Sequence, residues 1–96
     1  MDFQFEYDDD KAAANLKKHH IDFDDARLAF FDQYRSEHVD DRESYGEDRW
    51  ITIGFAGPIL LVVTYTMRGD TIRLISARRA QRHEEAIYAK HRKEHD

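Results

Sequence analysis

Residues 59–77 constrain the fold of this 96-residue chain most strongly, because they form a strand–turn–strand pattern. Ile59–Met67 is apolar at successive positions at its start, which predicts a strand buried on both faces near the centre of a sheet. Gly69 and Asp70 fit a two-residue hairpin loop that needs a positive φ at the glycine. Thr71–Ala77 is therefore predicted to return antiparallel to the first strand.

The short loop fixes the register of this hairpin, and with it the face on which each side chain lies. Arg68 pairs with Thr71 in this register, and Arg73 shares a polar face with Arg68 and the threonines of the first strand. Strict alternation places Arg78 on the opposite face. Arg78 can then join Arg68 only if the chain bends or leaves the sheet near Ala77.

The remaining pattern predicts an α+β fold in one domain spanning residues 1–96. The other expected elements are a half-buried strand over residues 2–7, helices over residues 8–20 and 24–31, strands over residues 34–41 and 49–55, and a helix over residues 80–93. A turn around Tyr45 and Gly46 joins the two middle strands. We therefore expect a small antiparallel sheet flanked by two N-terminal helices and one C-terminal helix.

Four arginines around the hairpin suggest a site for a polyanion. They are Arg68, Arg73, Arg78 and Arg79. Guanidinium groups present planar, permanently charged forks of N–H donors that suit phosphate oxygens. Arg78, Arg79 and Arg82 are also expected at the start of the last helix, where the macrodipole disfavours cations. A bound anion explains that placement better than helix stability does.

The net charge of −5 is unevenly distributed along the chain. Residues 1–48 hold 15 acidic and 6 basic side chains, whereas residues 49–96 hold 5 acidic and 9 basic ones. A strongly acidic protein binds nucleic acid poorly, but a local basic face can bind it while the acidic side of the protein repels it. The acidic half equally suits a basic protein partner.

Several functional classes are excluded by composition. The chain has no cysteine, which rules out disulfides and cysteine-based nucleophiles or metal sites. The longest apolar run, Ile59–Val63, is too short to cross a bilayer, and the first residues do not resemble a secretory signal. His91 and His95 have the spacing of some zinc ligands, but no third ligand is evident. We expect a soluble, cytoplasmic protein with neither a cofactor nor a metal ion.

Four stretches of sequence carry a family resemblance over residues 5–88. They are Tyr7-Asp8-x-x-Lys11-Ala12-x-x-Asn15-Leu16-x-Lys18-His19, Phe23-Asp24-x-Ala26, Arg49-Trp50-x-Thr52-Ile53-Gly54, and Thr66-x-Arg68 followed by Ile72-Arg73-Leu74-Ile75-Ser76-Ala77-Arg78-Arg79-Ala80. In this order and spacing they resemble the BrnT toxins of bacterial type II toxin–antitoxin modules. The chain departs from that family at Tyr7, His20 and Met67, where Trp, Gly and Glu are usual.

The resemblance implies a RelE-like fold and a ribonuclease activity that arrests translation. It also implies neutralisation by a BrnA-type antitoxin that carries a ribbon-helix-helix DNA-binding domain. Such complexes pair two toxins with an antitoxin dimer and repress their own operon, so operator DNA is expected to bind only through the antitoxin complex. No contact with a membrane is expected.

Metal-independent RNA cleavage requires a base for the 2′-hydroxyl, cations for the phosphorane and an acid for the leaving oxygen. We predict Arg68 and Arg78 or Arg79 as the phosphate-stabilising residues, with Arg73 as the next candidate. The identities of the acid and the base stay open at this point. Asp70, beside Arg68, is a predicted catalytic residue and one candidate, although aspartate also suits the turn itself, and His19 is the other.

The predicted RNA-binding residues each have a structural alternative. His19 has a suitable intrinsic pKa, but a histidine at a helix C-terminus also satisfies the dipole. Lys18 either binds phosphate or is solvated. Trp50 and Tyr45 can stack on bases, although a lone tryptophan on a half-buried strand more often belongs to the core.

The leading hypothesis is thus a toxin that acts as a metal-independent endoribonuclease on cellular RNA. One alternative is a nucleic-acid-binding module without catalysis, which salt-sensitive RNA binding with no product would favour. The other is a protein-interaction domain whose acidic helices bind a basic partner and which is indifferent to RNA.

Overall fold

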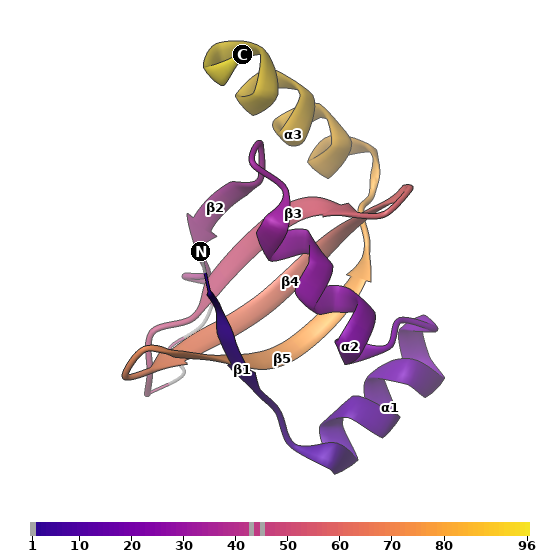
Figure 1. Ribbon diagram of the computed structural model, residues 1–96, viewed down its shortest axis with the longest axis vertical. Helices are drawn as coiled ribbons and strands as arrows, with labels where there is room; N and C mark the ends of the chain where they lie inside the picture. The colour runs from indigo at the N-terminus through magenta and orange to yellow at the C-terminus, as the bar shows by residue number, and fades with distance from the viewer. Residues whose placement is uncertain (1, 43, 45) are drawn as a thin grey trace.

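The computed structural model describes residues 2–42, 44 and 46–96 and confirms the α+β class. A five-stranded sheet has the strand order β1-β5-β4-β3-β2 (Figure 1). Its strands are β1 (Gln4–Glu6), β2 (Ser36–Val39), β3 (Trp50–Ala56), β4 (Ile59–Arg68) and β5 (Thr71–Arg79). The helices are α1 (Asp9–His19), α2 (Phe23–Ala26), the 3-10 helix η1 (Arg27–Phe31) and α3 (Arg82–His95).

The predicted hairpin is confirmed at its tip and in its register. Gly69 has a φ of 60°, and Arg68 pairs with Thr71 across the two-residue loop. β4 is the central strand of the sheet, as its apolar start predicted. The expectation of a purely antiparallel sheet is wrong, because β1 pairs with β5 in the parallel direction. Alternation along β1 identifies its buried face but carries no information on the direction of its neighbour.

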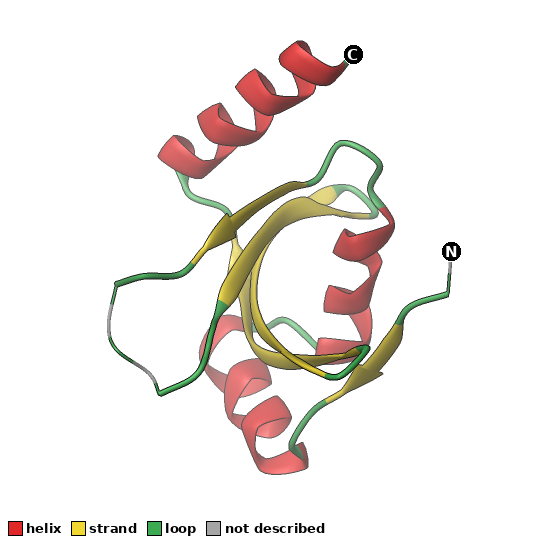
Figure 2. Ribbon diagram, turned by 90° about the vertical axis from the view of Figure 1, so that its left-hand side faces the viewer, coloured by secondary structure: helices red, strands yellow, loops and turns green. Residues whose placement is uncertain are grey.

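The sheet carries its larger hydrophobic core on one face. Figure 2 shows the strands curving around α2 and η1. The buried residues of this core are Ile21, Phe23, Ala26, Ala29, Phe30, Leu61, Val63, Tyr65, Ile72, Leu74 and Ala77. The second predicted helix therefore exists as α2 continued by η1, and its apolar side chains fill the curve of the sheet.

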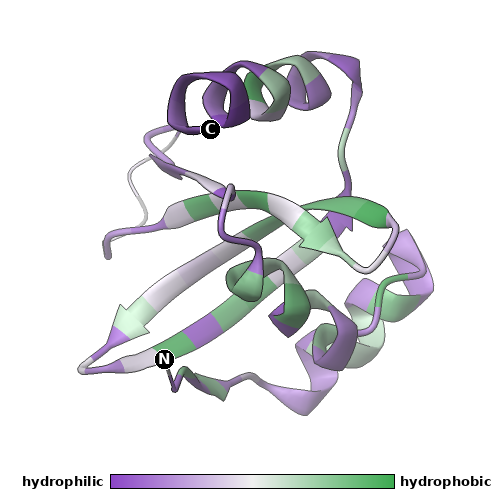
Figure 3. Ribbon diagram, turned by 45° about the horizontal axis from the view of Figure 1, so that its top comes forward, coloured by the Kyte–Doolittle hydropathy of each residue, from purple (hydrophilic) through white to green (hydrophobic). Residues whose placement is uncertain are grey.

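The opposite face of the sheet has a smaller core beneath α3, built from Ile53, Val62 and Tyr88. Figure 3 shows that α3 is hydrophilic along most of its length, so little apolar surface holds it in place. Tyr88 instead donates a hydrogen bond to Asp32 at 2.7 Å. Burial and this carboxylate raise the pKa of Tyr88 to about 12. The phenol therefore stays protonated and remains a donor over the whole physiological pH range.

The last helix begins later than predicted, at Arg82. Glu84 accepts a hydrogen bond from the backbone N–H of Gln81 at 2.8 Å and so fixes this helix start. Arg78 and Arg79 consequently belong to β5, and the expectation that they oppose the helix dipole is wrong, whereas Arg82 does begin α3 as expected. The predicted turn at Tyr45 and Gly46 falls partly on Tyr45, which lies outside the described residues.

Asn15 fastens α1 to the sheet beyond the point where β1 ends. Its buried side-chain amide accepts a hydrogen bond from the N–H of Ala77 at 3.0 Å and donates to the carbonyl of Ala77 at 2.9 Å. The same amide donates to the carbonyl of Ile21 at 3.0 Å. The Asn15 side chain thus satisfies the backbone N–H and carbonyl of Ala77 at the β5 edge, as a neighbouring strand would. Its hydrogen bond to Ile21 also fixes the chain that follows α1.

We predict that Asn15→Asp destabilises the fold by about 3 kcal/mol, because it removes both donors and sets a carboxylate against two buried carbonyl oxygens. Urea unfolding, read as a shift in midpoint at constant m-value, measures the loss. Lys17→Ala on the exposed side of α1 is the control and should change stability by less than about 0.5 kcal/mol. An Asn15→Asp midpoint equal to that of the wild type would contradict this role.

Candidate functional site

A β-bulge in β5 decides which arginines share a face of the sheet. Leu74 pairs with Tyr65, whereas the next pair along β4 is Thr64 with Ser76, so Ile75 is an extra residue in β5. Paired residues lie on the same side of the sheet, and the extra residue reverses the alternation. The prediction that Arg78 lies opposite Arg73 is therefore wrong.

After the bulge, the polar face of the sheet continues from Arg73 through Ser76 to Arg78, which pairs with Val62. Thr64 and Thr66 provide the neighbouring polar positions on β4 and are both buried. This polar face lies on the side of the sheet that α3 covers at one end, since Val62 packs with Tyr88.

An open groove with a volume of about 350 Å³ runs between α1 and this polar face. We call it the α1–β5 groove. Its lining residues are Lys11, Ala14, Asn15, Lys18, His19, Arg49, Ile75 and Ser76. The Asn15 hydrogen bonds to Ala77 hold its two walls in register. Three of the lining side chains are permanent cations and a fourth is a histidine, which suits a phosphate ligand.

His19 lies in an electropositive, partly buried setting at the end of α1. Burial lowers the pKa of His19, and the positive charges of Lys18, Arg78 and His20 lower it further. Arg78 therefore lies close enough to His19 for its charge to be felt. A neutral imidazole beside permanent cations can accept a proton at neutral pH.

Arg78 is held by a two-point ion pair with Glu84 of α3. Its two terminal nitrogens lie 2.7 and 2.6 Å from the Glu84 oxygens. Burial would raise the pKa of Glu84, but hydrogen bonds from Arg78 and the Gln81 amide, with the charges of Arg78 and His83, hold it below its usual value. Glu84 thus stays ionised and orients the Arg78 guanidinium. The Arg78 side chain remains 31% exposed.

The structure separates the arginines that the sequence placed together. Arg68 and Asp70 are exposed at the hairpin tip. Arg78 pairs with Val62, six residues along β4 from Arg68, which corresponds to about 20 Å of strand. One phosphate cannot contact both ends. Arg79 pairs with Leu61 and points to the other face.

Two further predicted RNA-binding residues have structural contacts. Arg73 forms an ion pair with Glu6 of β1 at 2.9 Å. Trp50 is half-buried and packs against the larger core beside its cross-strand partner Tyr65. Lys18 and His19, in contrast, line the groove. The predicted base-stacking role of Tyr45 lies outside the described residues.

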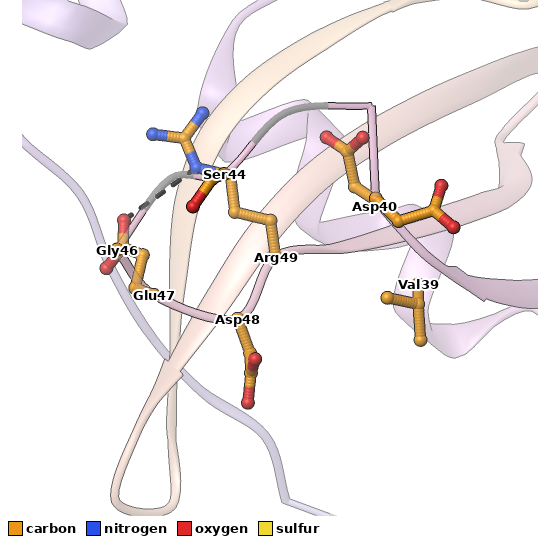
Figure 4. A pocket seen from close by; sticks show the side chains of 8 residues that line it. Val39, Asp40, Ser44, Gly46, Glu47, Asp48 and Arg49 are labelled. Atoms are coloured by element: carbon orange, nitrogen blue, oxygen red, sulfur yellow. Dashed lines mark ion pairs between the residues drawn. The ribbon is translucent and has the colours of Figure 1, made fainter.

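A larger cavity, of about 530 Å³, lies elsewhere and has the opposite charge character. Figure 4 shows its lining near the β2–β3 connection, including Asp40, Glu47, Asp48 and Arg49. The Arg49 Nε atom lies 3.8 Å from a Glu47 carboxylate oxygen, and both residues line this cavity. The carboxylates around it would repel a phosphate, so the α1–β5 groove is the better anion site.

Among residues 2–42, 44 and 46–96, no three His, Asp or Glu side chains come together in a way that could hold a metal ion. His91 and His95 stack on each other with ring centroids 4.1 Å apart, and His95 contacts the His91 carbonyl. In that same part of the chain, no helix is both long and apolar enough to span a membrane.

A comparison with protein-family models decides the family. Residues 7–84 match the model described as the ribonuclease toxin, BrnT, of type II toxin–antitoxin systems. The chain belongs to this family. The BrnT family is one of ribonucleases, which makes RNA the substrate class and an antitoxin the expected partner class. A search of curated proteins finds no match.

The matched region contains every residue that lines the groove and ends at Glu84, the partner of Arg78. Sequence reasoning missed the polar lining residues Lys11, Asn15, Arg49 and Ser76. Arg49 lies two residues before Ile51 and so on the same face, and the pairing of Ile51 with Thr64 identifies this face as the polar one. The apolar residues at 51, 53 and 55 gave no sign of this, and the face of Ser76 depends on the bulge.

We predict that the His19 imidazole of this BrnT toxin titrates below the ordinary histidine pKa. Lys18→Gln should raise the pKa of His19, because one of the charges that disfavours the imidazolium is removed. Imidazole NMR signals followed across pH measure both values. Lys17→Gln is the matched control and should leave the titration unchanged. An unshifted His19 in the wild type would show that the cations do not act on it.

Proposed function

We propose that this BrnT toxin cuts cellular RNA at the α1–β5 groove without a metal ion and thereby stops translation. The observation that carries the proposal is the environment of His19, which favours the neutral imidazole beside Lys18 and near Arg78. A neutral imidazole is the form that acts as a general base. The surrounding cations suit the negative charge that develops on the non-bridging phosphate oxygens in the transition state.

In the proposed reaction, His19 takes the proton of a ribose 2′-hydroxyl, and the 2′-oxygen attacks the adjacent phosphorus. Lys18, Arg49 and Arg78 stabilise the negative charge of the phosphorane. The bond from phosphorus to the 5′-oxygen then breaks, which leaves a 2′,3′-cyclic phosphate and a 5′-hydroxyl. No second imidazole lines the groove among the described residues, so the Lys18 ammonium or a water protonates the leaving oxygen.

Glu84 supports this chemistry by fixing Arg78 rather than by transferring a proton. A carboxylate that accepts hydrogen bonds from Arg78 and from the Gln81 amide is a weak base. Its bidentate contact holds the guanidinium plane in one orientation, which lowers the entropy cost of binding a phosphate.

In this proposal Arg68, Asp70, Arg73, Arg79 and Trp50 do not contact the phosphate that is cut. They contact a longer RNA or a partner instead. Arg68 and Asp70 occupy the exposed hairpin tip, and Arg79 is exposed at the end of β5.

We further propose that a BrnA-type antitoxin with a ribbon-helix-helix domain neutralises the toxin in the bacterial cytoplasm, and that residues 1–96 act as one toxin domain. The 15 acidic side chains within residues 1–48 favour a basic protein segment as the partner. The net charge of −5 disfavours direct binding to operator DNA, so DNA contact falls to the antitoxin.

The test is to incubate the purified protein with total RNA in EDTA and to identify the new ends. Wild-type protein should leave 2′,3′-cyclic phosphates and 5′-hydroxyls. His19→Gln should lower the cleavage rate by about 10²-fold or more, because the general base is lost. Arg68→Ala, at the hairpin tip, should keep cleavage within about threefold of the wild type.

Other outcomes would contradict this proposal in distinct ways. An inactive Arg68→Ala together with an active His19→Gln would move the catalytic centre to the hairpin tip. Cleavage that EDTA abolishes would contradict the metal-independent mechanism. Salt-sensitive binding of RNA by the wild type with no product, also in the presence of ribosomes, would favour a binding module without catalysis.

A further inference from the structure

Lys11 lines the α1–β5 groove at the end remote from His19. Lys11 and Lys18 are seven residues apart on α1, which is about two helical turns, so both face the groove. The same spacing places their Cα atoms about 10 Å apart along the helix axis. The groove therefore carries positive charge along its length and not only beside the imidazole.

Lys11 forms no ion pair with any residue that the structure describes. Several arginines, in contrast, are matched to acids, as Arg73 is to Glu6 and Arg78 is to Glu84. Lys11 also lies in the first turn of α1, directly after Asp9 and Asp10. The macrodipole disfavours a cation there, so helix stability does not account for a lysine at this position.

A chain of phosphates explains this arrangement better than a single anion does. The cut phosphate, held near Lys18, His19 and Arg78, leaves Lys11 too far away to share it. Successive phosphates of one extended strand, however, would follow the α1 wall from one lysine to the other.

We propose that Lys11 forms a second phosphate subsite, which binds single-stranded RNA at a phosphate one or two nucleotides from the cut bond. The inference rests on the proposed function, because that function places the cut phosphate at the His19 end of the groove. The toxin then recognises a stretch of RNA backbone through α1. A dinucleotide, which has only the phosphate to be cut, does not reach Lys11.

The test compares Lys11→Gln with Lys17→Gln, a lysine of the same helix that does not line the groove. Each variant and the wild type are assayed for kcat/KM on a dinucleotide and on a hexanucleotide RNA. Their Kd for the 2′-O-methyl forms of both oligonucleotides is measured over a range of salt. The methylated RNA cannot be cleaved, so binding is read independently of catalysis.

Lys11→Gln should lower kcat/KM and affinity for the hexanucleotide by roughly threefold to tenfold, with dinucleotide values unchanged. The slope of log Kd against log salt should fall by about 0.7 for the hexanucleotide, as expected for one lost phosphate contact on a single strand. Lys17→Gln should behave as the wild type on both lengths.

Three results would overturn the subsite. One is a Lys11→Gln variant with wild-type hexanucleotide affinity. Another is an equal loss on both lengths, and the third is an equal loss in Lys17→Gln, which would indicate a diffuse charge effect. If the wild type binds the hexanucleotide but cuts neither RNA, the proposed function fails, and the binding comparison alone decides the subsite.

Discussion

The hydrogen bonds between Asn15 and Ala77 are the constraint on which the candidate site depends. β1 pairs with β5 only as far as Arg73, so the rest of that strand edge needs another partner. The Asn15 amide supplies it, and in doing so it fixes α1 across the edge of the sheet. Lys18 and His19 follow one turn later on the same helix. Their distance from the polar face is therefore set by one buried side chain.

The extra residue in β5 provides the other half of the site. Without Ile75 as a bulge, Ser76 would face the larger core and Arg78 would lie away from α3. With it, Arg78 meets both the His19 environment and Glu84 of α3. The bulge thus connects three elements, α1, β5 and α3, through one guanidinium. Bulges commonly redirect side chains in this way near functional sites.

The sequence predicted what depends on local patterns. The hairpin, its register at Arg68 and the central position of β4 follow from a two-residue loop and an apolar run. The parallel pairing of β1 and the hydrogen bonds between Asn15 and Ala77 could not be predicted from local patterns, because both join segments more than 60 residues apart. A polar residue on an otherwise ordinary helix gives no sign of the strand edge that it completes.

The cationic character of the candidate site was predicted from the sequence, but its position in the fold was not. Lys18, His19 and Arg78 were among the predicted residues. Lys18 and His19 line the α1–β5 groove, and the charge of Arg78 acts on His19. Closeness in sequence wrongly grouped Arg68 with Arg78, since a strand of this length carries its two ends about 20 Å apart. Only the pairing of β4 with β5 shows that separation, together with the change of face at the bulge.

The central claim is that RNA binds along the α1–β5 groove. Titrating isotope-labelled toxin with a 2′-O-methyl oligonucleotide, while recording backbone amide NMR shifts, tests this claim most directly. The account predicts that the largest shifts fall on residues 11–20 and 75–78, with little change at the hairpin tip around Gly69. Shifts concentrated at the tip, with an unchanged groove, would contradict it.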